Sequence, residues 1–139
     1  MATSEQRKDP LELFAGIKQH DVTVIDIVPS YWRNCNHALS SLDCGSRQVL
    51  LCNKLRLILS ASEPLLSDVP HHWRFQFQHG AKFINMFGQT ETCGIVAVYP
   101  ISSQPDEQVK VVPLGCPIAN TQIYLLDQKF TTSTNWSSW

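Results

Sequence analysis

The chain has 139 residues, of which 11 are basic and 12 are acidic, so its formal net charge is −1. A chain of this length can fold as one domain, burying roughly two thirds of the surface of the unfolded chain. Because there is no run of like charges and no basic stripe, we expect neither nucleic acid nor a membrane as a partner. The N-terminal residues lack an apolar core, and nowhere do about eighteen apolar residues follow one another, which predicts a cytoplasmic protein.

The five cysteines form an odd set without a C-x-x-C pair. In a chain without a secretory signal we expect reduced thiols rather than a disulfide framework. The histidines show no zinc spacing, and their nearest approach to one is Cys35-x-His37 and the pair His71-His72. We interpret these side chains as surface or helix-lining residues.

The first predicted elements are a helix, a strand and a second helix. Residues 9–12 read D-P-L-E, a capping-box arrangement with Asp in place of Ser or Thr, so a helix should begin there and extend to about His20. Residues 22–28 form an almost continuous apolar run, which is typical of a strand covered on both faces. Pro29 then opens a helix that extends to about Leu42.

A strand and a helix are predicted next. A polar stretch with Gly45 leads to an apolar strand at 55–60. Residues 67–68, a Ser and an Asp, can cap a helix that carries an aromatic pair one turn apart and is closed by Gly80.

The strand predicted at 82–87 continues an alternation of strands and helices. Connections of this length favour parallel pairing with right-handed crossovers, so the strands at 22–28, 55–60 and 82–87 should lie side by side, with helices on the faces of the sheet. Residues 102–106 have a loop-like composition, and residues 121–127 alternate enough to form a later strand. The predicted fold class is therefore α/β.

Residues 85–92 read N-M-F-G-Q-T-E-T and directly follow an apolar run. Gly88 lets the backbone approach a ligand closely, Thr90 can donate to a phosphate oxygen, and Glu91 can bind a hard cation such as Mg²⁺. Ligands of open α/β sheets collect outside the carboxyl ends of the strands, where this segment should lie. Read alone, the pattern fits a strand-ending turn equally well.

Four stretches, in order, resemble motifs of the adenylate-forming (ANL) superfamily. Residues 85–91 resemble N-x-[YF]-G-x-T-E, and L-R-L-I-L-S-A-S-E-P-L at 55–65 resembles the family strand and turn that contain G-G-E. V-T-V-I-D-I-V-P-S at 22–30 resembles the preceding family strand, with V-T and P-S at its ends. Residues 113–127 resemble I-G-R-P-I-A-N-T-Q-x-Y-x-L-D, which is typical of the amino-acid adenylation domains of nonribosomal peptide synthetases. The chain thus resembles an internal fragment of such a domain.

The resemblance implies a partial parallel sheet with flanking helices from the large N-terminal lobe of an adenylate-forming enzyme. It implies a disordered N-terminus at 1–8, a partial AMP-binding or adenylation domain at 9–130, and a non-matching tail at 131–139. The implied reaction joins a carboxylic acid, foremost an amino acid, to ATP with the help of Mg²⁺, giving an acyl-adenylate and pyrophosphate. The implied partners are that small-molecule acid, neighbouring synthetase fragments and a carrier protein.

Site residues follow from the same resemblance. Thr90 would contact the α-phosphate and Glu91 would bind Mg²⁺, and these two are the candidate catalytic residues. The candidate nucleotide-binding residues, with Phe87 against the adenine ring and Asn85 bonded to its amino group, are Asn85, Met86, Phe87, Gly88, Ser62, Glu63 and Pro64. Plain alternatives are Phe87 as a core residue, Asn85 as a turn former, Thr90 as a helix cap and Glu91 as a solvated carboxylate.

The acyl pocket implied by the resemblance is lined by Asp26, Leu59, Ala61, Met86, Gly94 and Ile95. Asp26 is its informative member, because a carboxylate in a buried strand is costly unless it is paired. It either meets a polar or cationic group of the substrate or bonds to a backbone amide nearby.

Several parts of the family pattern do not occur in the sequence. No Ser/Thr/Gly-rich phosphate loop, Y-R-T-G-D segment or lysine-bearing C-terminal lobe is recognisable, so we expect the chain to be inactive alone. Gln89 and Phe87 stand where peptide synthetases usually have Pro and Tyr, and G-Q-T-E also occurs in acyl-CoA synthetases. The alternatives are therefore a subunit of a split adenylating enzyme, a fatty or aryl acyl-CoA synthetase fragment, and a non-enzymatic remnant or interaction module.

Overall fold

The computed structural model describes residues 8–102 and 109–126, which form one five-stranded sheet with helices packed on it. The expected disordered stretch at 1–8, apart from Lys8, and the expected tail at 131–139 lie outside the described residues. In chain order the elements are α1 (Pro10–Gln19), β1 (Val24–Asp26), α2 (Pro29–Ser40), α3 (Cys44–Leu51), β2 (Leu57–Ser60), α4 (Asp68–Phe77), β3 (Lys82–Gln89), the short 3-10 helix η1 (Thr90–Thr92), β4 (Gly94–Ile101) and β5 (Cys116–Pro117).

Local capping accounts for the helix starts. Asp9 caps α1 by accepting a hydrogen bond from the Leu11 amide at 2.8 Å, and Pro10 takes the first helical position. The bond reaches Leu11 rather than Glu12, so the capping-box detail of the prediction is wrong although the helix is confirmed. α2 begins at Pro29 as predicted.

Helix α3 occupies the polar stretch that was predicted only as a connection. The Asp43 carboxylate accepts from the Ser46 amide at 3.0 Å, which satisfies one of the free amide groups at the helix start. Gly45 lies inside this first turn, and no side chain of α3 is buried. Its apolar residues Val49, Leu50 and Leu51 are consecutive at the end of the helix, so they do not show the spacing on which a prediction from hydrophobic periodicity depends.

The sheet confirms the predicted parallel core. β1 pairs in parallel with β2, and β2 in parallel with β3, with Ile25, Ile58 and Phe83 in one row. Beyond β3 the sheet turns antiparallel, since β4 pairs with β3 and β5 with β4. The β3–β4 hairpin was not predicted from the sequence.

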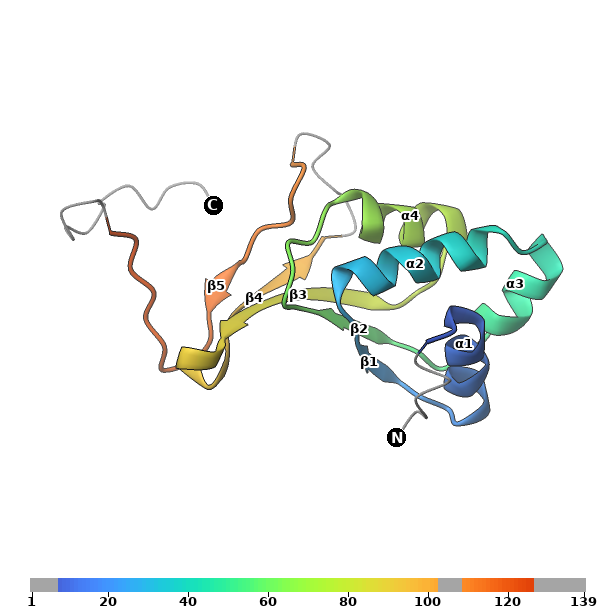
Figure 1. Cartoon of the computed structure of the whole chain (residues 1–139), viewed down its shortest axis with the longest axis horizontal. Helices are drawn as coiled ribbons and strands as arrows, with labels where there is room; N and C mark the ends of the chain where they lie inside the picture. The colour runs from blue at the N-terminus through green and yellow to red at the C-terminus, as the bar shows by residue number, and fades with distance from the viewer. Residues whose placement is uncertain (1–7, 103–108, 127–139) are drawn as a thin grey trace.

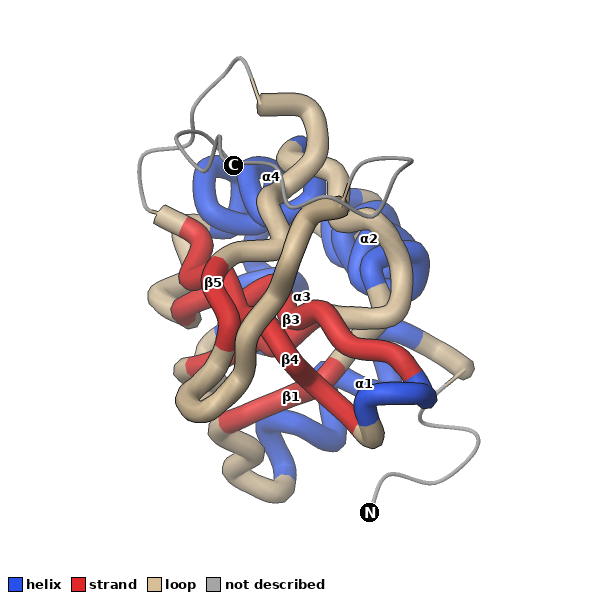
Figure 2. Tube along the Cα trace, turned by 90° about the vertical axis from the view of Figure 1, so that its left-hand side faces the viewer, coloured by secondary structure: helices blue, strands red, loops and turns tan. Residues whose placement is uncertain are grey.

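Among the described residues, helices cover one face of the sheet and none lies on the other, uncovered face (Figures 1 and 2). Ile58 and Phe83, which share a row, are buried under the helices, whereas Val24 and Asp26 on β1 are exposed. The apolar run of β1 had predicted a strand covered on both faces, and this prediction is wrong. An apolar run signals low polarity on both sides of a strand but does not say whether both sides have a neighbour.

An aromatic cluster joins the helices to the sheet. The Trp73 ring lies 5.5 Å from Phe14 and 6.3 Å from Trp32, and Trp32 lies 5.2 Å from Phe83, measured between ring centroids. All four side chains are at most 1% exposed. Aromatic pairs at these separations add about 0.5–1.5 kcal/mol each to the gain from burial.

Two further predictions differ from the structure. Helix α4 ends at Phe77 and is capped by Gln78, which adopts a left-handed conformation with φ of 51°, so Gly80 does not close it. Residues 121–125 form no strand, Leu126 occupies an isolated bridge position, and the last residue of the predicted strand lies outside the described part of the chain. Of the loop predicted at 102–106, only Ser102 is described.

Candidate functional site at the carboxyl edge of the parallel strands

Strands β1 and β2 end at a common edge, and β3 passes this edge and continues to Gln89. The Ile27 amide donates to the Leu59 carbonyl at 3.0 Å, and the buried Ser60 hydroxyl donates to the Ile27 carbonyl at 2.8 Å. Ser60 is in turn paired with Asn85 on β3. This edge therefore brings together the three segments in which the sequence placed its candidate site residues.

The β3–β4 turn explains Gly88 differently from the sequence prediction. β3 does not stop at this residue, because the strand continues to Gln89 after a register shift between Phe87 and Gly88. A Cβ atom on Gly88 would lie 2.1 Å from the Gly94 carbonyl oxygen. The backbone that approaches Gly88 closely is thus that of β4, and a side chain would push the two strands apart.

Thr92 closes this turn and was missed by the sequence analysis. Its hydroxyl donates to the Gln89 carbonyl at 2.9 Å and accepts from the Gln89 amide at 3.2 Å. Gln89 caps η1, so Thr90 is not its N-cap. The sequence signal that could have identified Thr92 is a hydroxyl residue three positions after the end of a strand, a spacing that allows it to cap the turn.

Thr90 and Glu91 are exposed on η1, at the outer end of β3. Their side chains lie beyond the strand end, in the region where open sheets bind ligands. A hydroxyl and a carboxylate in solvent can take part in binding a phosphate and its metal ion without displacing any described contact.

Asn85 is 2% exposed and is neither a turn former nor open to solvent. Its side-chain nitrogen donates to the Pro113 carbonyl at 2.9 Å, and the Val112 carbonyl lies 3.5 Å away. The side chain thus holds the segment around residue 113 against β3. Phe87, two residues further along the same strand, is half-buried and pairs with Ala97.

The turn after β2 is tied to helix α2 through Glu63. One carboxylate oxygen of Glu63 accepts from the Ser30 amide and the other accepts from the Ser30 hydroxyl, each at 2.9 Å. Ser62, the preceding residue, has a φ of 76°, in the left-handed region that disfavours a residue with a Cβ atom. Pro64 is exposed.

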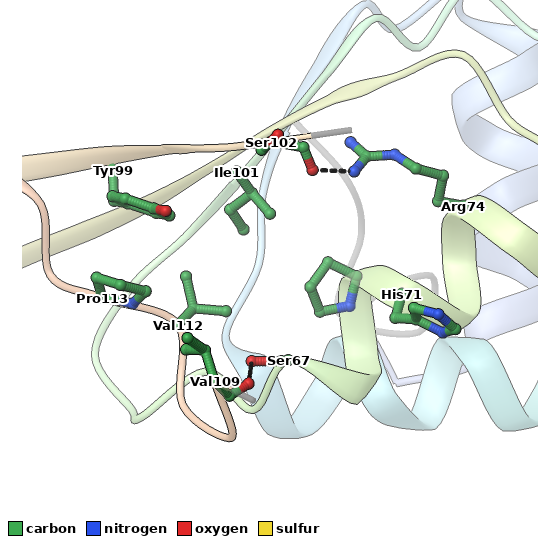
Figure 3. Close-up of a pocket in the computed structure, with 10 residues that line it drawn as sticks. Ser67, His71, Arg74, Tyr99, Ile101, Ser102, Val109, Val112 and Pro113 are labelled. Atoms are coloured by element: carbon green, nitrogen blue, oxygen red, sulfur yellow. Dashed lines mark hydrogen bonds between the residues drawn. The ribbon is translucent and has the colours of Figure 1, made fainter. Parts of the chain in front are cut away.

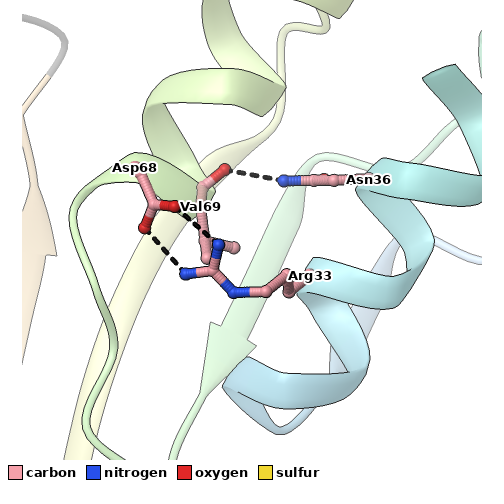
Figure 4. Close-up of polar contacts among 4 residues, drawn as sticks. All are labelled: Arg33, Asn36, Asp68 and Val69. Carbon is pink, nitrogen blue, oxygen red and sulfur yellow. Dashed lines mark hydrogen bonds and ion pairs between the residues drawn. The ribbon is translucent and has the colours of Figure 1, made fainter.

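An ion pair joins helices α2 and α4 just beyond this turn (Figure 4). The Arg33 guanidinium on α2 donates two hydrogen bonds, at 2.6 and 2.8 Å, to the Asp68 carboxylate at the start of α4. These bonds hold the pKa of the Asp68 carboxyl below its ordinary value and raise that of Arg33. The buried Asn36 amide nitrogen adds a hydrogen bond to the Val69 carbonyl at 2.9 Å.

Three of the six residues of the implied acyl pocket share the uncovered face. Asp26 pairs with Leu59, and Leu59 with Ile84, two residues before Met86 on the same strand. Because side chains alternate along a strand, Asp26, Leu59 and Met86 point to one side. The exposed Asp26 is not the buried carboxylate that the sequence analysis assumed.

The remaining pocket residues lie at the ends of these strands. Ala61 follows β2 and is half-buried. Ile95 pairs with Gly88, and Gly94 pairs with Gln89, which places both in the first residues of β4. None of the six residues of the implied pocket lines the two cavities described next.

Two small cavities flank the edge. One, of about 60 Å³, lies between α4, β4 and the segment near Pro113, and is lined by Arg74, His71 and Tyr99 among others (Figure 3). The other, of about 180 Å³, lies beside Ser30, Glu63 and Arg33. Both are smaller than the roughly 300 Å³ at which pockets for small-molecule ligands begin.

The described residues contain no cluster of three or more His, Cys, Asp or Glu side chains able to hold a metal ion by themselves. All five cysteines lie in this part of the chain, and each is a free thiol. Burial raises the pKa of the Cys35 thiol to about 12, so it remains protonated at neutral pH. In the same residues, no helix is long and apolar enough to cross a membrane.

The chain matches the AMP-binding enzyme family over residues 1–133 and belongs to that family. It is 30% identical over 132 residues to the beta-alanyl-bioamine nonribosomal peptide synthetase ebony of Drosophila melanogaster, covering 92% of this chain and 15% of that protein. It is 31% identical over 129 residues to enterobactin synthase component F of Escherichia coli (strain K12), covering 91% and 10%. The chain thus spans 15% or less of the length of these two relatives.

Solved structures agree with this assignment. The nonribosomal peptide synthetase FmoA3, in a form bound to alpha-methyl-L-serine-AMP, is 25% identical with a TM-score of 0.76, covering 92% of this chain and 14% of that chain. IdnL1 gives a TM-score of 0.80 at 16% identity, covering 96% and 26%, and shows likeness of fold alone. The predicted α/β fold and the predicted correspondence to part of an adenylation domain are confirmed.

Proposed function

We propose that this chain supplies one wall of a nucleotide and acid site in a domain that activates a carboxylic acid, foremost an amino acid, with ATP. Membership of the AMP-binding family supports this chemistry. The observation that carries the proposal is the carboxyl edge where β1 and β2 end and past which β3 continues to the exposed Thr90 and Glu91 of η1. Residues 9–130 would be the contributing part of the domain.

In the proposed nucleotide site, the adenine base and the ribose would lie at the strand ends, and the phosphates would lie at η1. Phe87 would pack against adenine, with Ser62 and Pro64 near its other face and Met86 and Gly88 shaping the strand end. Because the side-chain nitrogen of Asn85 already donates to Pro113, its oxygen is the atom that would accept from the adenine amino group. The Thr90 hydroxyl would donate to the α-phosphate.

Glu91 is the proposed protein ligand of Mg²⁺. This ion is usually bound by one or two carboxylates together with substrate phosphates, so a single exposed carboxylate fits the residues described. When bound, the ion would neutralise charge on the phosphates. Glu91 itself would only hold it near the end of β3.

The acid would lie on the uncovered face, against Asp26, Leu59 and Met86, with Ala61, Gly94 and Ile95 at the strand ends. An acid carrying a cationic or polar group would meet the Asp26 carboxylate. The acid's carboxylate oxygen would bond to the α-phosphorus of ATP, the bond from that phosphorus to the β-phosphate would break, and pyrophosphate would leave. A carrier protein or another thiol would accept the acyl group, and the ATP requirement favours a cytoplasmic location.

The test is exchange of labelled pyrophosphate into ATP, with the purified chain and with the common amino acids plus a few aryl and fatty acids. No recognisable phosphate loop or lysine clamp occurs in residues 1–139, and one missing electrostatic clamp typically costs about 10²–10³ in rate. We therefore expect weak ATP binding that Glu91→Ala weakens further, and no exchange above that variant.

Three results would change or contradict the proposal. Exchange that exceeds the Glu91→Ala control would show that the isolated chain is a complete catalyst. Exchange that appears only when other adenylation-domain segments are added would identify the chain as a subunit of a split enzyme. ATP binding that is absent, or equal in wild type and Glu91→Ala, would contradict the assigned phosphate site.

A further inference from the structure

We propose that Glu63 is a positioning residue that clamps the turn after β2 against the start of helix α2, and that it does not itself contact the nucleotide. The inference rests on the proposed function for the identity of the ligand, but the clamp is visible without it. It replaces the direct nucleotide contact that the sequence implied for this carboxylate.

The first observation is the geometry of the carboxylate. Both oxygens of Glu63 are engaged with Ser30, one with its amide and one with its hydroxyl, each at 2.9 Å. Ser30 is the second residue of α2, and the N-cap of this helix, Val28, provides no side-chain hydrogen bond. Glu63 therefore performs from a distant turn the capping that Val28 cannot perform, and its negative charge is favourable at the positive end of the helix.

The second observation is the strain of the neighbouring residue. Ser62 has a φ of 76°, in a backbone region that is unfavourable for a residue with a Cβ atom. Such conformations persist when surrounding contacts determine them, and they gather at ligand sites. The Glu63 clamp is the described side-chain contact that fixes this turn to a rigid element.

The third observation is location. Ser60, the last residue of β2, pairs with Asn85, and β3 continues from there to Phe87, so the turn that contains Ser62 leaves β2 where β3 passes the edge. This is the carboxyl edge at which the proposed nucleotide lies. A clamp that fixes the turn at Ser62 would thus set its distance from Phe87, and with it the width of the proposed adenine slot.

A spectroscopic test reports the clamp without any ligand. In the full chain labelled with ¹⁵N, the Ser30 amide signal should shift as the Glu63 carboxylate is protonated in acid, and this shift should vanish in Glu63→Gln. The matched control is Glu12→Gln, which removes an exposed carboxylate on α1 and should leave the Ser30 titration unchanged. A Ser30 signal that titrates equally in wild type and Glu63→Gln would overturn the clamp.

A binding test reports its role. With a fluorescent methylanthraniloyl derivative of ATP as the probe, Glu63→Gln and Ser30→Ala should each weaken affinity about fivefold, the worth of about one hydrogen bond, and their effects should not add. Glu12→Gln should change affinity less than twofold. If Glu63→Gln weakens affinity while Ser30→Ala leaves it unchanged, Glu63 contacts the nucleotide directly and the inference is wrong.

The two tests separate this inference from the proposed function. A wild-type chain that does not bind the probe, yet shows the Ser30 titration, overturns the proposed nucleotide site and leaves the clamp as a feature of the fold. A chain that binds the probe with no effect of either substitution keeps the proposed function and overturns the positioning role.

Discussion

At the scale of single residues, Gly88 and Ser62 show how backbone geometry shapes the candidate site. The absence of a Cβ atom at Gly88 allows β4 to approach β3, whereas Ser62 keeps its Cβ atom in a conformation that glycine adopts more readily. The family pattern that residues 61–63 resemble has glycine at the position of Ser62. Both residues border the common strand edge, so substitutions there test local strain close to the proposed site.

Gly88→Ala should destabilise the fold by about 3 kcal/mol, because the new Cβ atom would lie 2.1 Å from a backbone oxygen that cannot move without opening the hairpin. Urea unfolding followed by circular dichroism measures the change. Gly80→Ala is the matched control, since a Cβ atom there would meet nothing within 4 Å. Equal stability of the two variants would contradict the close approach of the strands.

Ser62→Gly should stabilise the fold by about 0.5 kcal/mol, because relief of the left-handed strain exceeds the entropy cost of glycine. The same substitution at Ser46, within the first turn of α3, should destabilise the fold by a similar amount. Thermal unfolding of both variants measures the pair of effects. Destabilisation by Ser62→Gly would mean that the serine side chain makes a favourable contact that outweighs the strain.

At the scale of elements, the packing of α4 depends on neutral histidines. The half-buried His79 ring accepts from the Ala81 amide at 3.2 Å, and burial holds its pKa below the ordinary value. Burial also lowers the pKa of His72, whose ring nitrogen lies 2.9 Å from the Ser40 hydroxyl on α2. Both rings contact aromatic side chains, so their protonation would place charge within the helix layer.

These lowered pKa values predict how stability changes with pH. The unfolded chain takes up protons near the ordinary histidine pKa of about 6.5, while the folded chain resists protonation, so the contribution is complete above that pH and is lost as pH falls toward the folded pKa. The free energy of unfolding should therefore decrease from about pH 7 to about pH 5. His79→Gln should reduce this slope, whereas substitution of the exposed His20 by Gln should preserve it; equal slopes in all three proteins would contradict the prediction.

At the scale of the whole molecule, the sheet has a covered face and an uncovered face. Ile58 points toward the helices and is 0% exposed, while Ile84 lies in the row of Asp26 and Leu59 on the other side and is half-buried. This asymmetry leaves the proposed acid-binding face accessible. It also concentrates the packing energy of the described residues on one side of the sheet.

The two isoleucines allow a matched test of this asymmetry. Ile58→Ala should lower the free energy of unfolding by about 3–4 kcal/mol, because it opens a cavity in the core. Ile84→Ala should lower it by about 1 kcal/mol, because this side chain is only half-buried and loses less packing. Chemical denaturation of both variants measures the difference. Comparable losses would show that the second face of the sheet is as well packed as the first.

Local sequence was sufficient to predict several elements. The Asp9-Pro10 start of α1, the Pro29 start of α2 and the three parallel strands were predicted because capping chemistry and apolar runs act within a few residues. Four motifs in order, within residues 22–127, together identified the family that the comparison confirms. Helix α3 was not predicted because its apolar residues, Val49 to Leu51, are consecutive and follow a polar stretch, so they gave no helical spacing.

The sequence by itself thus determined the parallel core, its helix starts and the family. Only the tertiary structure decided that the sheet is covered on one face, that β4 returns antiparallel against Gly88, and that Glu63 binds Ser30. The physical reason is that these features depend on which segments meet, whether six residues apart, as Gly88 and Gly94 are, or 33 apart, as Ser30 and Glu63 are. Period and composition describe each segment but not which segment it will face.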